Sequence, residues 1–228
     1  MSERYKYNRE GYLNENFRMF HLRDTAGQER DFHFHEFDKI VILISGSVNY
    51  MVEGTDYTLE PWDILLVRHH MIHKALIDMS VPYERIIIYI DSAYVERFAP
   101  EGGLMDCFAE AEKRRFCLMR PDRGEIEKLK DSLDRLESSI SDTEFGAELM
   151  RGTLLAQLMV QLNRIMQRDT SSKAAPAEQS GKISAALSYI NENLTGSLSV
   201  DELAAMCYLS RYHFMRLFKQ QTGCTVHN

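Results

Sequence analysis

The alternation of apolar and polar positions divides the 228-residue chain into a strand-rich first part and a helical second part. Up to about residue 100, short runs of β-branched and aromatic residues recur between groups of Gly, Pro, Asp and Ser, which favour turns. Many short strands at close spacing are typical of a sandwich or a small barrel. The strand-like runs are FHFHEFDKIVILI from residue 32, SVNYMV from 47, DYTL from 56, DILLV from 63 and YERIIIYI from 83.

From about residue 104 to residue 168 the apolar positions follow a helical period instead. A heptad-like seam predicts a first helix, which Asp122 and Glu125 would cap. Ser141 and Glu144 predict a capping box for a second helix, whose apolar arc is wide enough to need more than one neighbour. Such helices either pack only on their own barrel or also bury against a second copy, and we expect a homodimer. The seam consists of Ile126, Leu129, Leu133, Leu136 and Ile140, and the arc of Phe145, Leu149, Leu154, Leu155, Leu158, Met159, Leu162 and Ile165.

Residues 169–181, DTSSKAAPAEQSG, are small and polar with one proline, a composition typical of a flexible linker. Three short helices are predicted after it. The second begins at a capping box of Ser199 and Glu202, and Ser210 would cap the third after a tight turn. This spacing is typical of a helix-turn-helix. One face of the first helix carries Ile183, Leu187, Ile190 and Leu194, and Gly196 follows as a stop signal.

The last helix has an apolar face and a cationic face. Phe214, Leu217 and Phe218 would face a small core. The outer residues suit a recognition helix, because cations contact phosphates and guanine edges while apolar groups contact thymine methyls. The alternative, a merely solvated face, normally carries mixed charge. The outer residues are Arg211, Tyr212, Met215, Arg216 and Lys219.

The stretch LSVDELAAMCYLSRYHFMRLFKQQTG closely resembles the first helix-turn-helix of AraC-type transcription regulators. The resemblance implies base contacts by Tyr212, Met215 and Arg216, with Arg211 and Lys219 nearer the DNA backbone. Tyr208 stands where the family often has glycine in the turn, and a bulky residue there, if left-handed, costs about 1 kcal/mol.

The family's DNA-binding domain contains two helix-turn-helix units, whereas this sequence stops at GCTVHN, where the helix joining them would begin. We therefore expect a truncated sequence, or a natural sensor fragment that binds DNA weakly and inhibits full-length relatives. A single recognition helix offers few phosphate contacts, so its DNA affinity should be weak and steeply salt-dependent unless a dimer doubles it.

Members of this family often carry a cupin-like barrel before the DNA-binding part, and the first hundred residues loosely resemble one. Gly27, His33, His35 and Gly46 resemble the first cupin motif. Pro61 and His73 resemble the second, with Asp63 where aspartate is frequent and Trp62 where glycine is usual. Trp62 could stack on a ring at the barrel mouth, or be an exposed turn residue.

Strand parity places the imidazoles of His33 and His35 on one face, with Phe32 and Phe34 on the other. Together with His73 they could hold a metal, but Lys39 occupies the position of the glutamate ligand in cupin enzymes and shares the parity of the histidines. An ammonium repels a metal cation, so we expect no metal or other cofactor. The predicted effector site is His33, His35, Lys39 and His73, suited to a carboxylate or phosphate on a sugar acid, with neutral sugars remaining possible. Alternatively, Lys39 pairs with Glu36 or Asp38 at the barrel rim.

The net charge of −7 argues against an indiscriminate nucleic-acid binder, yet three cations and no acid lie between Ser210 and Gln221. The polar N-terminus, the short apolar runs and four cysteines without paired spacing predict a cytoplasmic protein with reduced thiols and no membrane segment. Catalytic motifs such as G-x-S-x-G, a phosphate loop or H-E-x-x-H are absent from the sequence. A metal-dependent cupin enzyme is the alternative of a different class.

The sequence thus predicts an α+β multidomain protein: a cupin-like barrel over residues 1–103, a helical dimerisation segment over 104–168, a linker over 169–181 and a helix-turn-helix unit over 182–228. We expect a ligand-responsive transcription regulator, an activator by family resemblance, whose partners are DNA, a sugar or carboxylate-bearing metabolite, and a second copy of itself.

Overall fold

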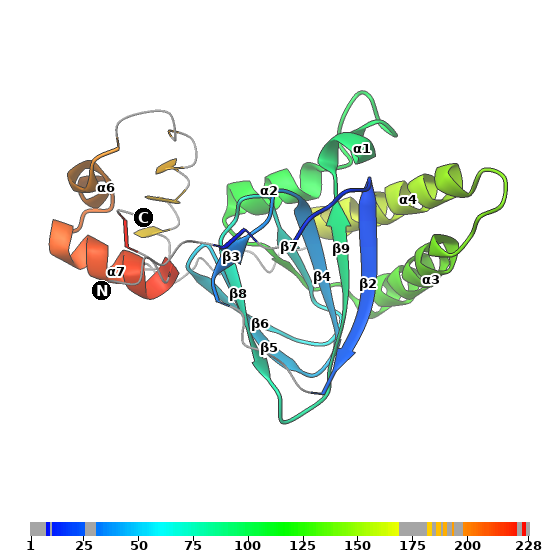
Figure 1. The fold of residues 1–228 in the computed structure, drawn as a ribbon, viewed down its shortest axis with the longest axis horizontal. Helices are drawn as coiled ribbons and strands as arrows, with labels where there is room; N and C mark the ends of the chain where they lie inside the picture. Colours follow the sequence, from blue (N-terminus) through cyan, green and yellow to red (C-terminus); the bar gives the residue numbers. More distant parts are fainter. Residues whose placement is uncertain are drawn as a thin grey trace.

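Strands form two facing sheets and helices cover one of them (Figure 1). The described residues of this computed structural model are 8–9, 11–25, 31–168, 182–183, 186–187, 189–190, 193, 198–222 and 225–226. The first sheet has the order β1-β3-β8-β5-β6 and the second β10-β7-β4-β9-β2. The strands are β1 (Asn8–Arg9), β2 (Phe17–Asp24), β3 (His33–Phe34), β4 (Asp38–Ser45), β5 (Ser47–Val52), β6 (Thr55–Leu59), β7 (Ile64–Val67), β8 (His73–Asp78), β9 (Tyr83–Ile90) and β10 (Leu118–Met119).

Alternation along the second sheet produces two apolar cores. On β4, Val41 and Leu43 point between the sheets, where they meet residues of both. Ile40 and Ile42 point outward into the core beneath the helices. Both faces of β4 and β7 are therefore covered, which explains why these strands read as continuous aliphatic runs in the sequence.

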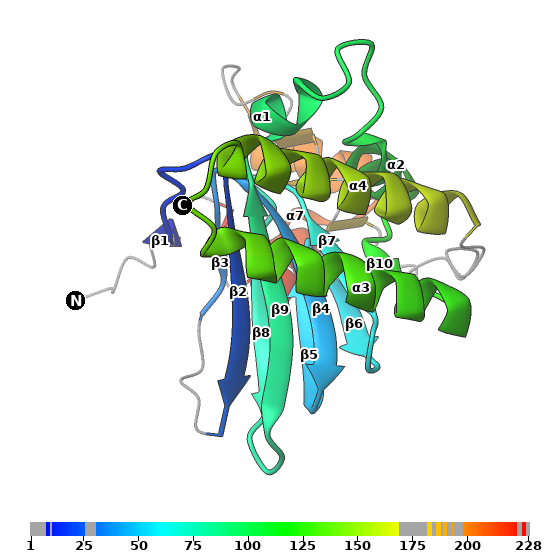
Figure 2. The ribbon, with the colours of Figure 1, turned by 90° about the vertical axis from the view of Figure 1, so that its right-hand side faces the viewer.

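Two long antiparallel helices lie across the outer face of the second sheet (Figure 2). They are α3 (Arg123–Ile140) and α4 (Ala147–Arg168), and the shorter α1 (Ser92–Glu96) and α2 (Asp106–Arg114) pack beside them. The predicted seam residues Leu129, Leu133 and Leu136 are buried in this layer. The apolar residues of α4 from Leu154 to Ile165 that the sequence placed on its broad arc are buried with them.

The two predicted capping boxes of the helical layer have different outcomes. Asp122 and Glu125 form the box at the start of α3, as predicted. The prediction for Ser141 and Glu144 is wrong: Ser141 is the C-cap of α3 and its hydroxyl donates to the carbonyl of Ser138. The α3–α4 turn follows, and α4 begins only at Ala147.

Helices α6 (Val200–Met206) and α7 (Arg211–Thr222) are joined by a short turn, as predicted. They pack on the described helical residues between 182 and 190. We call these parts together the C-terminal helical unit. Ser199 and Glu202 form a capping box, and Ser210 accepts from the N–H of His213, so both caps are confirmed. Tyr208 has φ +54°, so the turn residue is left-handed. The predicted linker, Gly27, Leu194 and Gly196 lie outside the described residues.

The strands predicted from the five runs are present, although the run from residue 32 is interrupted between β3 and β4. Strands β1, β2, β8 and β10 were not predicted, and β10 lies in the range that was predicted as helical. Burial along β2 and β8 does not alternate strictly, and Leu76 of β8 is apolar yet exposed, so the period of two is not visible in their sequences. Among the described helices, none combines the length and the apolar character needed to cross a lipid bilayer.

Candidate functional site

Strand alternation directs Lys39 into the end of the barrel. It shares its parity with Val41 and Leu43, which lie between the two sheets. Asp38 shares its parity with Ile40, which points to the helical layer. The alternative pairing of Lys39 with Asp38 is therefore wrong, because the two side chains leave β4 on opposite faces and the Asp38 carboxylate is bound by His69 and Ser92.

All four residues predicted for the effector site are brought together and buried, with exposed fractions of 0–5%. His33 and His73 are direct neighbours across β3 and β8. Their ring centroids lie 4.4 Å apart, and His35 lies 5.0 Å from each. The Nζ of Lys39 lies 3.4 Å from the Nε2 of His73. We call these four residues the histidine–lysine cluster.

The backbone fixes the orientation of two of the rings. The Nδ1 of His33 lies 2.8 Å from the carbonyl oxygen of Asp31, and the Nδ1 of His73 lies 3.0 Å from that of Met71. A carbonyl only accepts, so each ring carries a hydrogen on Nδ1. Burial, and then the charge of Lys39, hold the pKa of His73 well below its usual range. His73 is therefore neutral near pH 7 and its Nε2 presents a lone pair.

The donor set of the cluster only partly fits a metal ion. One nitrogen from each histidine lies within 4.8 Å of the other two, and a ring whose Nδ1 donates to a carbonyl is common among metal ligands. Lys39, however, directs its ammonium at the His73 nitrogen that would have to bind the cation. A cation at this point would meet a like charge in a buried site, so the set as a whole does not fit a metal.

Two aromatic residues of the site were not predicted. Phe37 stacks on His35 with centroids 4.7 Å apart and an interplanar angle of 12°. Tyr89 lies directly across β4–β9 from Lys39, and its ring is 4.2 Å from that of Phe37. The alternation in YERIIIYI could have indicated Tyr89, since Tyr83 on the same parity belongs to the inner core. The cluster thus combines one cation, nitrogen acceptors and an aromatic wall.

The interrupted strand corrects one step of the sequence reasoning. His33 and His35 were placed on one face of a single strand that also carried Lys39, but β3 ends at Phe34 and β4 begins at Asp38. The side chains still converge, because β3 and β4 lie in different sheets and Lys39 points from the inner face of the second sheet to His73 of the first. Trp62 lies in a turn, as one alternative predicted, but its side chain is half-buried. It packs against the helical core under Lys130, with φ +73°.

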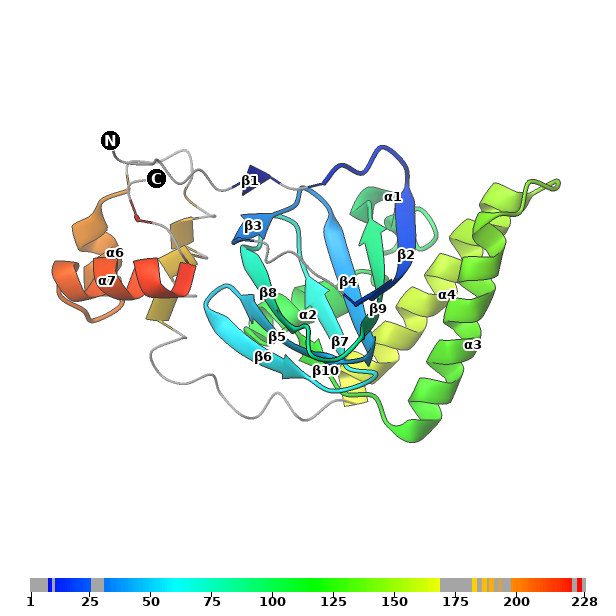
Figure 3. The ribbon, with the colours of Figure 1, turned by 60° about the horizontal axis from the view of Figure 1, so that its bottom comes forward.

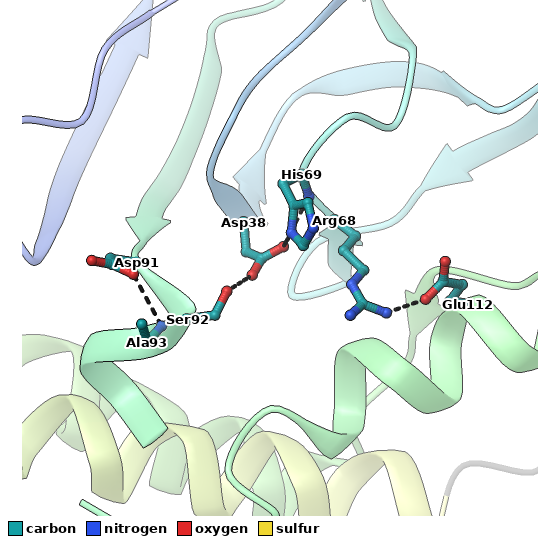
Figure 4. A network of polar contacts seen from close by, with 7 residues as sticks. All are labelled: Asp38, Arg68, His69, Asp91, Ser92, Ala93 and Glu112. Carbon is teal, nitrogen blue, oxygen red and sulfur yellow. Dashed lines mark hydrogen bonds and ion pairs between the residues drawn. The ribbon is translucent and has the colours of Figure 1, made fainter. Parts of the chain in front are cut away.

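A second polar network lies on the other face of β4 (Figure 4). The carboxylate of Asp38, 1% exposed, accepts from the backbone N–H of His69 at 2.8 Å, from its Nδ1 at 3.0 Å and from the Ser92 hydroxyl of α1. Arg68, next in the same loop, pairs with Glu112 of α2. The network therefore fastens the loop after β7 to β4 and to the helical layer.

Protonation of this network follows from its bonds. Burial would raise the pKa of Asp38, but the hydrogen bonds from His69 and Ser92 together hold that pKa below its usual value. The bond to Asp38 raises the pKa of His69. Ser92 donates to the aspartate and not to the imidazole, so the three residues do not have the geometry of a hydrolase triad.

The face of α7 predicted to contact DNA is largely exposed. Arg211, Tyr212, Arg216 and Lys219 are exposed, whereas Met215 is half-buried against the core of the C-terminal helical unit. Arg211 pairs with Asp201 of α6 at 2.6 Å, so its charge is partly used within the unit. The face is therefore less uniformly cationic than the sequence of α7 alone indicated.

Comparison with known proteins identifies the family of both parts. Residues 19–159, more than half of the chain, match the AraC-like ligand binding domain, and residues 190–228 match the bacterial regulatory helix-turn-helix proteins of the AraC family. The HTH-type transcriptional activator RhaS of Klebsiella pneumoniae (strain 342) is 22% identical over 194 residues, 85% of this chain and 66% of RhaS.

Comparison with solved structures also finds two regulatory proteins with TM-scores under 0.5, CuxR and ToxT. The AraC-like transcriptional activator CuxR is 11% identical with a TM-score of 0.42, covering 84% of this chain and 63% of that one. ToxT from Vibrio cholerae strain SCE256, with bound unsaturated fatty acid, is 13% identical with a TM-score of 0.40, covering 93% and 95%. The chain spans less than two thirds of the length of RhaS and of CuxR.

Proposed function

The chain belongs to the AraC family of bacterial regulatory helix-turn-helix proteins, and on that premise we propose that it is a ligand-responsive transcription regulator, not an enzyme. Its barrel binds a small organic anion, a sugar acid foremost, and α7 binds specific DNA. Transcription activation is the proposed output. The observation that carries the effector class is the buried ammonium of Lys39, 3.4 Å from the neutral His73.

The polarity of the histidine–lysine cluster supports a hydroxy acid over a simple acid. Lys39 can only donate, and therefore suits a carboxylate. The neutral His73, with its hydrogen on Nδ1, can only accept at Nε2, and therefore suits a hydroxyl donor. An effector that offers a carboxylate and neighbouring hydroxyls satisfies both, while the rings of Phe37 and Tyr89 suit the apolar face of a sugar.

Calorimetric titration with three matched probes tests the effector class. D-Gluconate offers a carboxylate and hydroxyls, D-glucose only the hydroxyls, and hexanoate only the carboxylate. We expect gluconate to bind most tightly, and Lys39→Met to weaken it by about 10-fold or more, because a charge-assisted hydrogen bond in a buried site is lost. Lys74→Met is the matched control, because Lys74 follows His73 on β8 but its ammonium pairs with the exposed Asp31.

Each other pattern of binding contradicts part of the proposal. Gluconate that binds Lys39→Met as tightly as the wild type would remove Lys39 from the site. Glucose that binds as tightly as gluconate would favour a neutral sugar. A stoichiometric transition metal in the purified protein would revive the cupin enzyme.

The homodimer remains part of the proposal, with a narrower surface than the sequence indicated. Most of the apolar arc of α4 is used within the chain. Four exposed apolar residues lie together near the turn between α3 and α4, which lies at the opposite end of the molecule from α6 and α7 (Figure 3). We call Ile140, Phe145, Leu149 and Met150 the tip patch, with exposed fractions of 41–107%.

A further inference from the structure

The inner face of β9 carries a second group of polar side chains beyond the histidine–lysine cluster. Tyr83 and Arg85 share the parity of Tyr89, so their side chains also point between the two sheets. The register places Arg85 opposite Leu43 of β4, which lies in the core between the sheets, and places Tyr89 opposite Lys39. Arg85 and the cluster therefore lie on one inner face, about 13 Å apart along the strand.

Residues of both sheets form this second group. The guanidinium carbon of Arg85 lies 4.5 Å from the ring centroid of Tyr83, and its Nη1 lies 2.5 Å from the Oδ2 of Asp24 on β2. Tyr50 of β5 approaches from the first sheet, and its hydroxyl lies near Tyr83 and Arg85. Burial raises the pKa of both tyrosines, so their hydroxyls keep their hydrogens and can donate or accept. We call Asp24, Tyr50, Tyr83 and Arg85 the distal group.

One hydroxyl of the distal group lacks a hydrogen bond within the protein. Tyr83 is 1% exposed, and its Oη, although near Tyr50, makes no hydrogen bond of good geometry within the part of the chain that the structure describes. A buried hydroxyl without a hydrogen bond costs about 1–3 kcal/mol, and buried polar groups are almost always bonded to protein, water or ligand. This hydroxyl, directed between the sheets, therefore points to a bound molecule that supplies the missing bond.

The inner face is accessible from solvent on the side of β2 and β8. Inner residues of β4 and β7 are buried, whereas those of β2, β8 and part of β9 are only half-buried. Ala75 lies two residues beyond His73 and opposite Tyr50, and its methyl group extends little toward the second sheet. A small molecule can therefore reach the cluster and the distal group from this side. The half-buried inner residues are Phe20, Leu22, Ala75, Ile77, Arg85 and Tyr89.

We propose that the effector site extends from Lys39 to Arg85, and that the distal group binds an uncharged, hydroxyl-bearing end of the effector. This inference rests on the proposed function, in which Lys39 binds the carboxylate end. Arg85 donates and Asp24 accepts, so their pair suits neighbouring hydroxyls, and Tyr83 supplies one more hydrogen bond. Asp24 already offsets the charge of Arg85 and would repel a second carboxylate. The site therefore selects a polyhydroxy monocarboxylate over a dicarboxylate.

Calorimetric titration of the full chain with three acids tests the two ends of the site separately. Glycolate has a carboxylate and one hydroxyl, D-gluconate adds a hydroxylated tail, and D-glucarate ends that tail in a second carboxylate. We expect the wild type to bind gluconate about 10-fold or more tightly than either other acid, the scale of one hydrogen bond. Arg85→Met should abolish the preference for gluconate over glycolate and leave glycolate binding unchanged. Asp24→Asn should strengthen glucarate binding about 10-fold relative to gluconate, because the repelling carboxylate is gone.

Two further variants separate ligand binding from damage to the barrel. Tyr83→Phe removes only a hydroxyl that makes no hydrogen bond of good geometry within the described residues, so the ligand-free variant should keep its stability in urea. Its affinity for gluconate should nevertheless fall about 5-fold or more, because the ligand loses a hydrogen bond. Arg23→Met is the matched control: Arg23 precedes Asp24 on β2 but is exposed and points away from the inner face, so all three affinities should stay unchanged.

The outcomes distinguish this inference from the proposed function. Gluconate binding that Lys39→Met weakens, but that Arg85→Met and Tyr83→Phe leave unchanged, overturns the distal group and leaves the effector class in place. Gluconate binding that Arg85→Met weakens and Lys39→Met does not overturns the effector class and leaves the distal group in place. A wild type that binds glucarate as tightly as gluconate overturns the selection against dicarboxylates, and one that binds none of the three acids overturns both proposals.

Discussion

The polar network around Asp38 makes a pH-dependent contribution to the stability of the barrel that can be measured with one substitution. In Asp38→Asn the carboxylate that accepts from His69 and Ser92 becomes a neutral amide at a position only 1% exposed. Hydrogen bonds to a charged group contribute about 1.5–3 kcal/mol each. His69 has 38% of its side chain exposed, so solvent screens its share, and we expect a total loss of about 2–3 kcal/mol.

The sign of the pH dependence follows from the two pKa shifts. The pKa of Asp38 is lowered in the folded state, so its contribution is present above the unfolded value near 3.8 and is lost as pH falls through the folded pKa. The pKa of His69 is raised, so its contribution is present below the unfolded value near 6.5 and is lost as pH rises through the folded pKa. The difference between wild type and Asp38→Asn should therefore be largest between these two values.

Urea unfolding at about pH 3, 5.5 and 8 measures this difference. The single tryptophan, Trp62, reports on the barrel, because it lies in the turn between β6 and β7. Asp56→Asn on β6 is the control, since Asp56 is exposed. A difference in unfolding free energy that stays constant across the three pH values would refute the linkage, and no difference at about pH 5.5 would refute the network.

Three other expectations concern DNA, assembly and the barrel turn. Arg216→Ala should weaken binding to a selected DNA site by about 1–3 kcal/mol and relax the sequence preference at that site. Lys219→Ala should weaken binding to all DNA sequences alike and reduce the slope of the salt dependence by about 1. Fluorescence anisotropy measures both effects, and an equal effect of Arg216→Ala on all sequences would contradict base contact by Arg216. The double variant Phe145→Ser and Leu149→Ser should sediment as a monomer where the wild type sediments as a dimer. A dimer that persists in the double variant would show that the tip patch is not the interface. Gly46→Ala should lower the free energy of unfolding by about 2–4 kcal/mol, because Gly46 has φ +103° and the added Cβ would lie 2.7 Å from the Pro82 carbonyl oxygen. If urea unfolding gave the variant the stability of the wild type, the turn would have relaxed to accept the Cβ.

Strand alternation explains only part of the histidine–lysine cluster. A period of two predicts that His33 and His35 point the same way. Lys39 does not share a strand with them: β3 and β4 belong to different sheets, and Lys39 reaches the cluster from the inner face of the second sheet. The motif resemblance added His73, which the register places opposite His33. The four residues therefore come together although the single strand assumed for three of them is wrong.

The polar network could not be predicted, because it depends on contacts between distant segments. Asp38 and Ser92 are 54 positions apart, and no local pattern relates a strand residue to the first residue of a five-residue helix. The predicted start of α4 was wrong for a similar reason: Ser141 has the residue type of an N-cap, yet it ends the preceding helix. Local propensity indicates which residues can cap a helix, whereas tertiary packing decides which of them do.

The side chain at position 39 determines what kind of ligand the barrel can accept. Three imidazoles, two of them with their Nδ1 hydrogens directed at carbonyls, are an arrangement that either a cation or a hydroxyl donor could use. A carboxylate at position 39 would lower the energy of a metal ion there, whereas the ammonium of Lys39 raises it and favours an anion. The same ammonium lies 3.4 Å from the Nε2 of His73, so an anion that binds Lys39 also changes the surroundings of His73.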